Sequence, residues 1–231
     1  AFIAAGKEMG FPYVDYNGPN QMGFSYLQAT IENGIRKSSN AAYLYPVKHR
    51  KNLHVKKNSR VTKLLIDDNK KVYGVRFYSN GKYYSVNATK EVILSAGAIN
   101  SPQILMLSGI GPRKHLESLG IKTLVNLAVG YNLMDHTAPG ALTFTVNTTT
   151  INIDNLLDLN TIDNYLNNLN GPISSAGGIE SIAFIETDKP YNPNGYPDLE
   201  FLQLGGGINI DLILKQNFGI RDDVYKEMFG A

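Results

Sequence analysis

The chain has 231 residues, of which 43% are hydrophobic and 18% are charged, a composition typical of a soluble globular protein with a sizeable core. Its formal net charge of +2 is too small to indicate a nucleic-acid or membrane partner, and the absence of cysteine excludes disulfides and thiolate metal sites. No apolar run approaches the length of a transmembrane helix, so we expect no membrane span. The chain begins with Ala1 inside an expected helix and ends at Ala231 without a terminal feature, which predicts an internal fragment of a longer protein.

The first fifty residues predict short helices and turns. A helix is expected at residues 1–9, closed by Gly10, and another at residues 39–44, stopped by Pro46. Residues 26–35 are compatible with either a strand or a helix.

The middle of the chain changes to short β-rich runs. Strands are expected at 53–57, 61–67 and 72–79, and a further strand follows "SNGK" at Ser79–Lys82. "DDNKK" and "SNGK" both carry the residues of hairpin turns.

A strand, a glycine turn and a helix come next. "EVILSAG" (Glu91–Gly97) is a continuous apolar run, which predicts a strand buried on both faces. In the following helix Ser101 is expected to cap the first turn, Pro102 to take the first helical position and Gly109 to end the helix.

Ligands of nucleotide-binding sheets lie at the carboxyl ends of strands, so Ser95, Ala96 and Gly97 become candidate ligand contacts. Gly97 either permits the backbone to approach a ligand or only makes the turn between strand and helix, and the residues alone leave both interpretations open.

Hydrophobic periodicity and turn residues predict the helices and strands of the rest of the chain. We expect a helix at 112–120, an edge strand at 121–130, a helix at 151–169 and strands at 181–186 and 199–204.

Several common sites are missing from the sequence. No G-x-G-x-x-G follows a strand, no phosphate-binding G-x-x-x-x-G-K-[ST] occurs, and no G-x-S-x-G provides a serine nucleophile. The four histidines, His49, His54, His115 and His136, lack metal-ligand spacing, so no metal site is expected. Two N-glycosylation sequons, Asn87-Ala88-Thr89 and Asn147-Thr148-Thr149, favour a secreted, extracellular protein.

"GAINSPQILMLSGIG" (97–111) resembles the second signature of the glucose–methanol–choline (GMC) flavoprotein oxidoreductases. "NGIRKSSNAAYLYP", "NLHVKKNSRVTKLLID", "KEVILSAG" and "VGYNLMDH" resemble other stretches of the family, in the family's order. The segments "NGPISSAGGIESIAFIET" and "YPDLEFLQLG" are most similar to insect members related to glucose dehydrogenase. The resemblance covers nearly the whole chain.

The resemblance implies an α/β fold with an α+β substrate part: a partial FAD/NAD(P)-binding Rossmann-like domain and a GMC-type substrate domain. It implies that residues 1–46 form a segment of the substrate domain that covers the FAD. Residues 47–138 would form part of the FAD-binding domain, and residues 139–231 part of the substrate-binding domain.

The resemblance also implies cofactor contacts. Val61 matches a Val whose backbone meets the adenine of FAD, and Ala96 and Gly97 match the strand end near the adenosine ribose. The helix that follows would close one wall of the FAD site. The residues expected at the cofactor are Val61, Ser95, Ala96, Gly97, Ser101, Asn132, Asp135 and His136.

The implied reaction is oxidation of a CH–OH group of a sugar or another small alcohol, with hydride transfer to flavin N5 and electrons passed to a quinone or to oxygen. The family's glycine fingerprint and its catalytic His match no residue here, so no residue is expected to be catalytic and the fragment is expected to be inactive alone.

Two alternatives remain. The first is a non-catalytic binding or structural protein derived from the same fold without flavin. The second, ranked last, is a nicotinamide-dependent dehydrogenase, which needs a glycine fingerprint that the sequence lacks.

Overall fold

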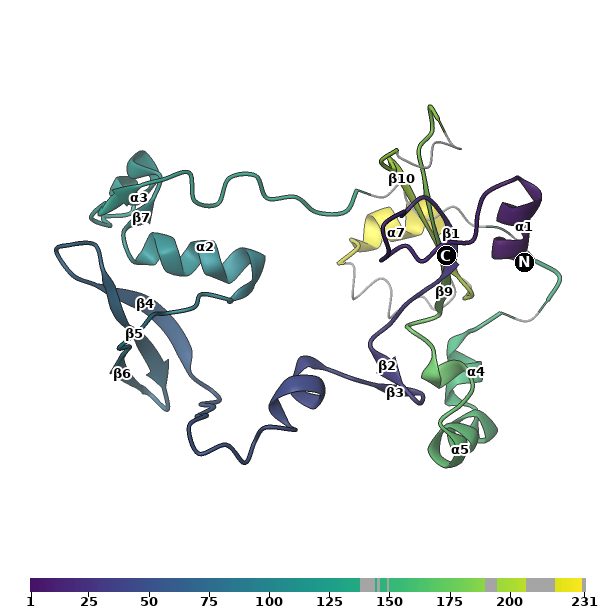
Figure 1. The fold of residues 1–231 in the computed structure, drawn as a ribbon, viewed down its shortest axis with the longest axis horizontal. Helices are drawn as coiled ribbons and strands as arrows, with labels where there is room; N and C mark the ends of the chain where they lie inside the picture. The colour runs from purple at the N-terminus through teal and green to yellow at the C-terminus, as the bar shows by residue number, and fades with distance from the viewer. Residues whose placement is uncertain (138–143, 145, 149, 190–194, 207–218, 230–231) are drawn as a thin grey trace. The chain divides into compact units, whose positions relative to one another are not determined.

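The computed structural model describes residues 1–137, 144, 146–148, 150–189, 195–206 and 219–229 (Figure 1). The chain divides into two compact units, one made of residues 1–49 and 142–231 and the other of residues 50–141.

The first unit is built around an antiparallel sheet with the strand order β1-β9-β10. Its strands are β1 (Gly23–Tyr26), β9 (Ile179–Ile185) and β10 (Leu199–Leu204). Phe24 of β1 pairs with Ala183 of β9, and both residues are buried. The predicted strands at 181–186 and 199–204 are confirmed.

Helix α1 (Phe2–Glu8) packs on this sheet and completes its small core. The ring of Phe24 lies 5.0 Å from the ring of Phe2 and 5.4 Å from that of Phe11, measured between centroids. A Cβ on Gly6 would lie only 2.5 Å from the Phe24 ring, so glycine allows the helix to approach the strand this closely.

Two small elements follow β1 in the chain. The ambiguous segment 26–35 contains neither one strand nor a helix, because it reverses at Asn33-Gly34 into the two-residue strands β2 (Ile31–Glu32) and β3 (Ile35–Arg36). The helix expected at 39–44 is a single π-helical turn at Asn40–Leu44.

The helix expected at 151–169 is divided in two, and this corrects the prediction. Helix α4 (Ile153–Leu157) ends where Asp158 adopts an extended conformation, and α5 (Leu159–Asn168) begins there. Asp158 Oδ2 accepts a hydrogen bond from Thr161 N–H at 3.0 Å, so its carboxylate caps a new helix instead of continuing the old one. A 3₁₀ turn at Pro172–Ser174 and helix α7 (Asp222–Phe229) are the other helical elements described here.

The second unit contains an antiparallel meander in the order β4-β5-β6. It consists of β4 (Arg60–Ile66), β5 (Val72–Ser79) and β6 (Lys82–Asn87). The β5–β6 turn places Asn80 and Gly81 at φ values of 47° and 78°, as a two-residue hairpin turn requires. Both predicted hairpins are confirmed.

Helix α2 (Gly97–Leu107) packs against β4, as Figure 1 shows. Short parallel strands β7 (Ile110–Gly111) and β8 (Val125–Asn126) flank helix α3 (Arg113–Ser118). Leu116 of α3 is fully buried. The edge strand expected at 121–130 is reduced to the two residues of β8.

Two predicted strands do not form among the described residues. Residues 53–57 have no ladder partner, because the basic side chains that fill this run leave too little apolar surface to bury. Residues 91–95 are also unpaired, and Ile93 is 78% exposed. A strand of a parallel sheet needs a neighbouring strand at its edge, and the described part of the second unit supplies none to this segment.

Candidate functional site

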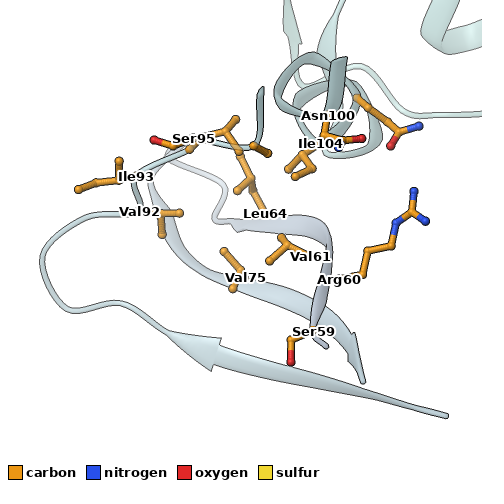
Figure 2. Close-up of a pocket in the computed structure, with 13 residues that line it drawn as sticks. Ser59, Arg60, Val61, Leu64, Val75, Val92, Ile93, Ser95, Asn100 and Ile104 are labelled. Atoms are coloured by element: carbon orange, nitrogen blue, oxygen red, sulfur yellow. The ribbon is translucent and has the colours of Figure 1, made fainter. Parts of the chain in front are cut away.

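A cavity of about 630 Å³ opens in the second unit, between the meander and the start of helix α2. Figure 2 shows Val61, Leu64 and Val75 on the sheet side, Ile104 and Asn100 on the helix side, and Val92, Ile93 and Ser95 on the connecting segment. The lining residues are Ser59, Arg60, Val61, Leu64, Val75, Val92, Ile93, Leu94, Ser95, Ala96, Asn100, Gln103 and Ile104.

Helix α2 is fixed to strand β4 by one buried serine. Ser108 Oγ donates a hydrogen bond to Ile104 O at 2.6 Å and accepts one from Leu64 N–H at 2.8 Å. Ser108 is 1% exposed and Leu64 is 5% exposed. Since β4 pairs with β5 on its other side, this hydroxyl satisfies a backbone donor that would otherwise be buried without a partner.

The helix begins at Gly97, five residues before Pro102, which corrects the predicted start. Pro102 therefore lies inside the helix. Ser101 does not cap from the expected position: its Oγ accepts a hydrogen bond from Ala96 N–H at 3.0 Å. The serine thus reaches back from within the helix to the N-cap residue, as the acidic residue of a capping box does.

Gly97 has a φ of +88°, a conformation that favours glycine. A Cβ built on Gly97 meets no atom within 4 Å. The turn therefore needs glycine for its backbone, and open space lies where a side chain would point. Both interpretations of Gly97 made from the sequence are compatible with this geometry.

The residues that line the cavity form two groups, an aliphatic group termed the floor and a polar group termed the rim. Val61, Leu64, Val75 and Ile104 provide aliphatic surface, whereas Ser59, Arg60, Ser95, Asn100 and Gln103 provide hydrogen-bonding groups. Its volume falls in the range of roughly 300–1,000 Å³ that is usual for small-molecule sites. A flat ring on the floor and hydroxyl groups at the rim are the ligand chemistry that this lining fits.

The structure brings only part of the expected cofactor set to this cavity. Val61, Ser95 and Ala96 line it, and Gly97 and Ser101 occupy the adjoining first turns of α2. The remaining three residues, Asn132, Asp135 and His136, are exposed in the segment after β8 and are not among the lining residues.

Asp135 and His136 make a local contact in the structure. His136 N–H donates a hydrogen bond to Asp135 Oδ1 at 2.8 Å, and Asn132 has a φ of +58°. Both features are local to the chain, and a contact with a cofactor stays a prediction for all three residues.

Four polar lining residues, Ser59, Arg60, Asn100 and Gln103, are not among the site residues predicted from the sequence. Asn100 and Gln103 are three residues apart on α2, and Ile104 lies four residues after Asn100, so all three share one helix face. That spacing was readable in the sequence. Arg60 directly precedes Val61, but nothing in the sequence distinguished it from the other basic residues nearby.

A smaller cavity of about 360 Å³ lies in the first unit beside β2 and β3. Its two cations are already bound: Lys37 Nζ lies 2.8 Å from Glu32 Oε2, and the Arg36 guanidinium donates to Ser175 O at 2.9 Å. The Lys37 ammonium lowers the pKa of the Glu32 carboxyl through a hydrogen bond and charge attraction. The first cavity is therefore the better ligand candidate.

Within the described residues, no helix is long and apolar enough to cross a membrane. The same residues contain no cluster of three or more His, Asp or Glu side chains that could hold a metal ion.

Comparison with known proteins identifies the family. A sequence profile for the family described as GMC oxidoreductase matches residues 1–138. The chain belongs to the GMC oxidoreductase family.

Relatives in this family agree with the match. The chain is 51% identical over 138 residues to an oxygen-dependent choline dehydrogenase of Staphylococcus saprophyticus, covering 59% of this chain and 24% of that protein. It is 46% identical over 139 residues to the glucose dehydrogenase [FAD, quinone] of Drosophila melanogaster, covering 59% of this chain and 22% of that protein. The chain thus spans about a quarter of the length of these relatives.

A solved structure of a formate oxidase matches with a TM-score of 0.69 and 28% sequence identity. The match covers 87% of this chain and 39% of the formate oxidase chain. The GMC resemblance, the mixed α/β fold class and FAD as the cofactor, all predicted from the sequence, are confirmed by these matches.

Proposed function

We propose that this GMC oxidoreductase chain is part of an FAD-dependent enzyme that oxidises the CH–OH group of a sugar or another small alcohol. The observation that carries the proposal is the cavity between β4 and α2, which joins Val61 to Ser95 and Ala96 at the glycine turn. The GMC signature also lies on α2, so the cavity and the family match concern the same residues.

The residues of the cavity fit the adenosine part of FAD. The aliphatic floor of Val61, Leu64, Val75 and Ile104 suits a purine ring, and the polar rim suits ribose hydroxyls. The open space at Gly97 leaves the backbone accessible to a ligand, because no protein atom lies where a Cβ would stand. In this proposal Val61, Ser95, Ala96, Gly97 and Ser101 hold or position the adenosine.

FAD, when bound, would supply the redox chemistry as the acceptor of a hydride from the alcohol carbon. The residues of this chain bind and orient the adenosine end of the cofactor. Ser101 holds Ala96 N–H, and Ser108 holds the helix against β4, so both act on the shape of the site without touching substrate.

The remaining assignments follow from this function. Residues 47–138 would form part of the FAD-binding domain, residues 1–46 would cover the cofactor, and residues 139–231 would contribute to substrate binding. The electron acceptor would be a quinone or oxygen, and the protein would be secreted. The names of the relatives support oxygen or a quinone as the acceptor, and the proposal of secretion rests on the two sequons.

An absorption spectrum of the full-length protein, purified without added cofactor, tests the proposal. We expect flavin bands in the visible region that bleach when choline or glucose is added without oxygen. A folded but colourless protein that does not take up added FAD would instead support the alternative, a binding or structural protein that kept the GMC fold without flavin.

A further inference from the structure

We propose that Asn87 is an acceptor of an N-linked glycan. Asn87-Ala88-Thr89 matches the acceptor pattern Asn-X-Ser/Thr, in which X is not Pro. Since such triplets arise often by chance, the position of the triplet in the fold carries the argument. The proposal also rests on passage through a secretory compartment, as expected above.

The triplet lies where the chain leaves a strand at the surface. Asn87 is the last residue of β6, and both Asn87 and Thr89 are exposed. Ala88 N–H donates a hydrogen bond to Tyr73 O at 2.8 Å, which fixes the backbone as it turns away from the sheet. In the part of the chain that the structure describes, no protein group forms a hydrogen bond with the Asn87 carboxamide, so its nitrogen is free to carry a substituent.

The modification is a group transfer without a redox step. The donor is an oligosaccharide linked through a diphosphate to a lipid. The Asn87 side-chain nitrogen forms a C–N bond with the anomeric carbon of the sugar, the C–O bond between that carbon and the diphosphate breaks, and the lipid diphosphate leaves while the amide nitrogen loses one proton. Because glycans are attached before folding is complete, the folded chain must leave the sugar room in solvent, and the exposed end of β6 does so.

A glycan at Asn87 would also shield an open sheet edge. Among the described residues, strand β6 pairs only with β5, and each of its six residues is exposed. Tyr83 is 58% exposed and Val86 is 53% exposed. Exposed edges of this kind invite pairing with another chain, and proteins protect them with charge or bulk. Lys82 stands at one end of the edge, and the glycan would stand at the other.

Peptide mapping of the full-length protein, secreted from insect cells, is the direct test. Enzymatic release of an N-glycan converts the modified Asn to Asp with uptake of a solvent oxygen, which mass spectrometry locates on the peptide. When the release is carried out in water that contains heavy oxygen, we expect Asp at position 87 to carry that isotope. A wild-type peptide with unmodified Asn87 in the secreted protein overturns the proposal, and this measurement needs no variant that must fold.

Variants test whether the glycan depends on the Asn87-Ala88-Thr89 triplet. Asn87→Gln and Thr89→Ala should each remove one glycan mass, whereas Thr89→Ser keeps an acceptor triplet and should retain the glycan. Asn147→Gln distinguishes the second sequon, whose Thr149 lies outside the described residues. Loss of a glycan in Asn147→Gln but not in Asn87→Gln would overturn the assignment to Asn87.

The shielding role has its own readout. Enzymatic deglycosylation should increase self-association of the purified protein in light scattering, and Tyr83→Lys should reduce that increase by adding charge to the edge. Unchanged scattering after deglycosylation would overturn the shielding role.

Discussion

Ser108 Oγ accepts a hydrogen bond from Leu64 N–H at 2.8 Å, and this bond joins helix α2 to the free edge of β4 beneath the candidate cofactor cavity. The same hydroxyl donates to Ile104 O, so one side chain links the helix backbone to the sheet backbone. Both Leu64 and Ile104 line the cavity, and the separation of its two walls therefore depends on this serine.

Ser108→Ala should lower the free energy of unfolding by about 1–3 kcal/mol, because the buried Leu64 N–H loses its partner. Urea unfolding monitored by circular dichroism measures this change. Ser118→Ala is the matched control: Ser118 Oγ also donates to a helix carbonyl, that of His115, but at an exposed site, where substitutions usually change stability by less than about 0.5 kcal/mol. Equal losses in the two variants would show that the bond to Leu64 has no special role.

Gly97→Ala should weaken the binding of FAD to the full-length protein, and it should also lower the stability of the protein. The backbone strain at a φ of +88° costs about 1–2 kcal/mol, and the new methyl group projects into the open space at the turn. Gly120→Ala is the control, because Gly120 has a φ of +70° and also no atom within 4 Å, but it follows α3, whereas Gly97 directly follows the lining residue Ala96. Titration with FAD should show weaker binding for Gly97→Ala only, and equal affinities would contradict the proposed site.

Asp158→Ala should destabilise helix α5 by about 1 kcal/mol, because Thr161 N–H loses its capping carboxylate. Thermal unfolding of the full-length protein measures this loss of stability. Asp158→Asn should keep most of the wild-type stability, since an amide oxygen also caps helices well. A failure of Asn to rescue would show that charge, rather than the hydrogen bond, stabilises this end.

The carboxylate of Asp198 makes stability depend on pH. Thr187 Oγ and Thr187 N–H both donate to it, at 2.5 and 2.9 Å, and these hydrogen bonds hold the pKa of Asp198 below its ordinary value. A lowered pKa in the folded state means that the stabilisation is present above the unfolded-state pKa and is lost as the pH falls through the folded-state pKa.

Asp198→Asn should therefore be less stable than the wild type at neutral pH, and the difference should shrink in acid below the ordinary pKa range of an Asp carboxyl. Melting temperatures measured from neutral pH down into this range give the result. Thr187→Val removes the hydroxyl that donates the shorter of the two hydrogen bonds. It should therefore reproduce part of the loss of stability at neutral pH. A constant difference across the whole range would show that the pKa shift does not contribute.

The sequence by itself determined the elements that short-range interactions define. The Asn80-Gly81 turn between β5 and β6 needs only two residues that accept positive φ. Gly109 ends the region of α2 with a φ of +85°, as expected of a residue beyond a helix C-terminus. The signature on α2 also indicated the family, because it is a local pattern of many fixed positions.

Tertiary structure alone decided which of the expected residues share a site. Val61 and Ser95 lie far apart in the sequence and line one cavity in the fold, where Ser108 links α2 to β4. The sequence also gave no sign that residues 91–95 would lack a partner strand, because pairing depends on segments elsewhere in the chain. Local propensity sets where a helix or a turn can form, but a cavity is made by long-range contacts, and no local pattern encodes their geometry.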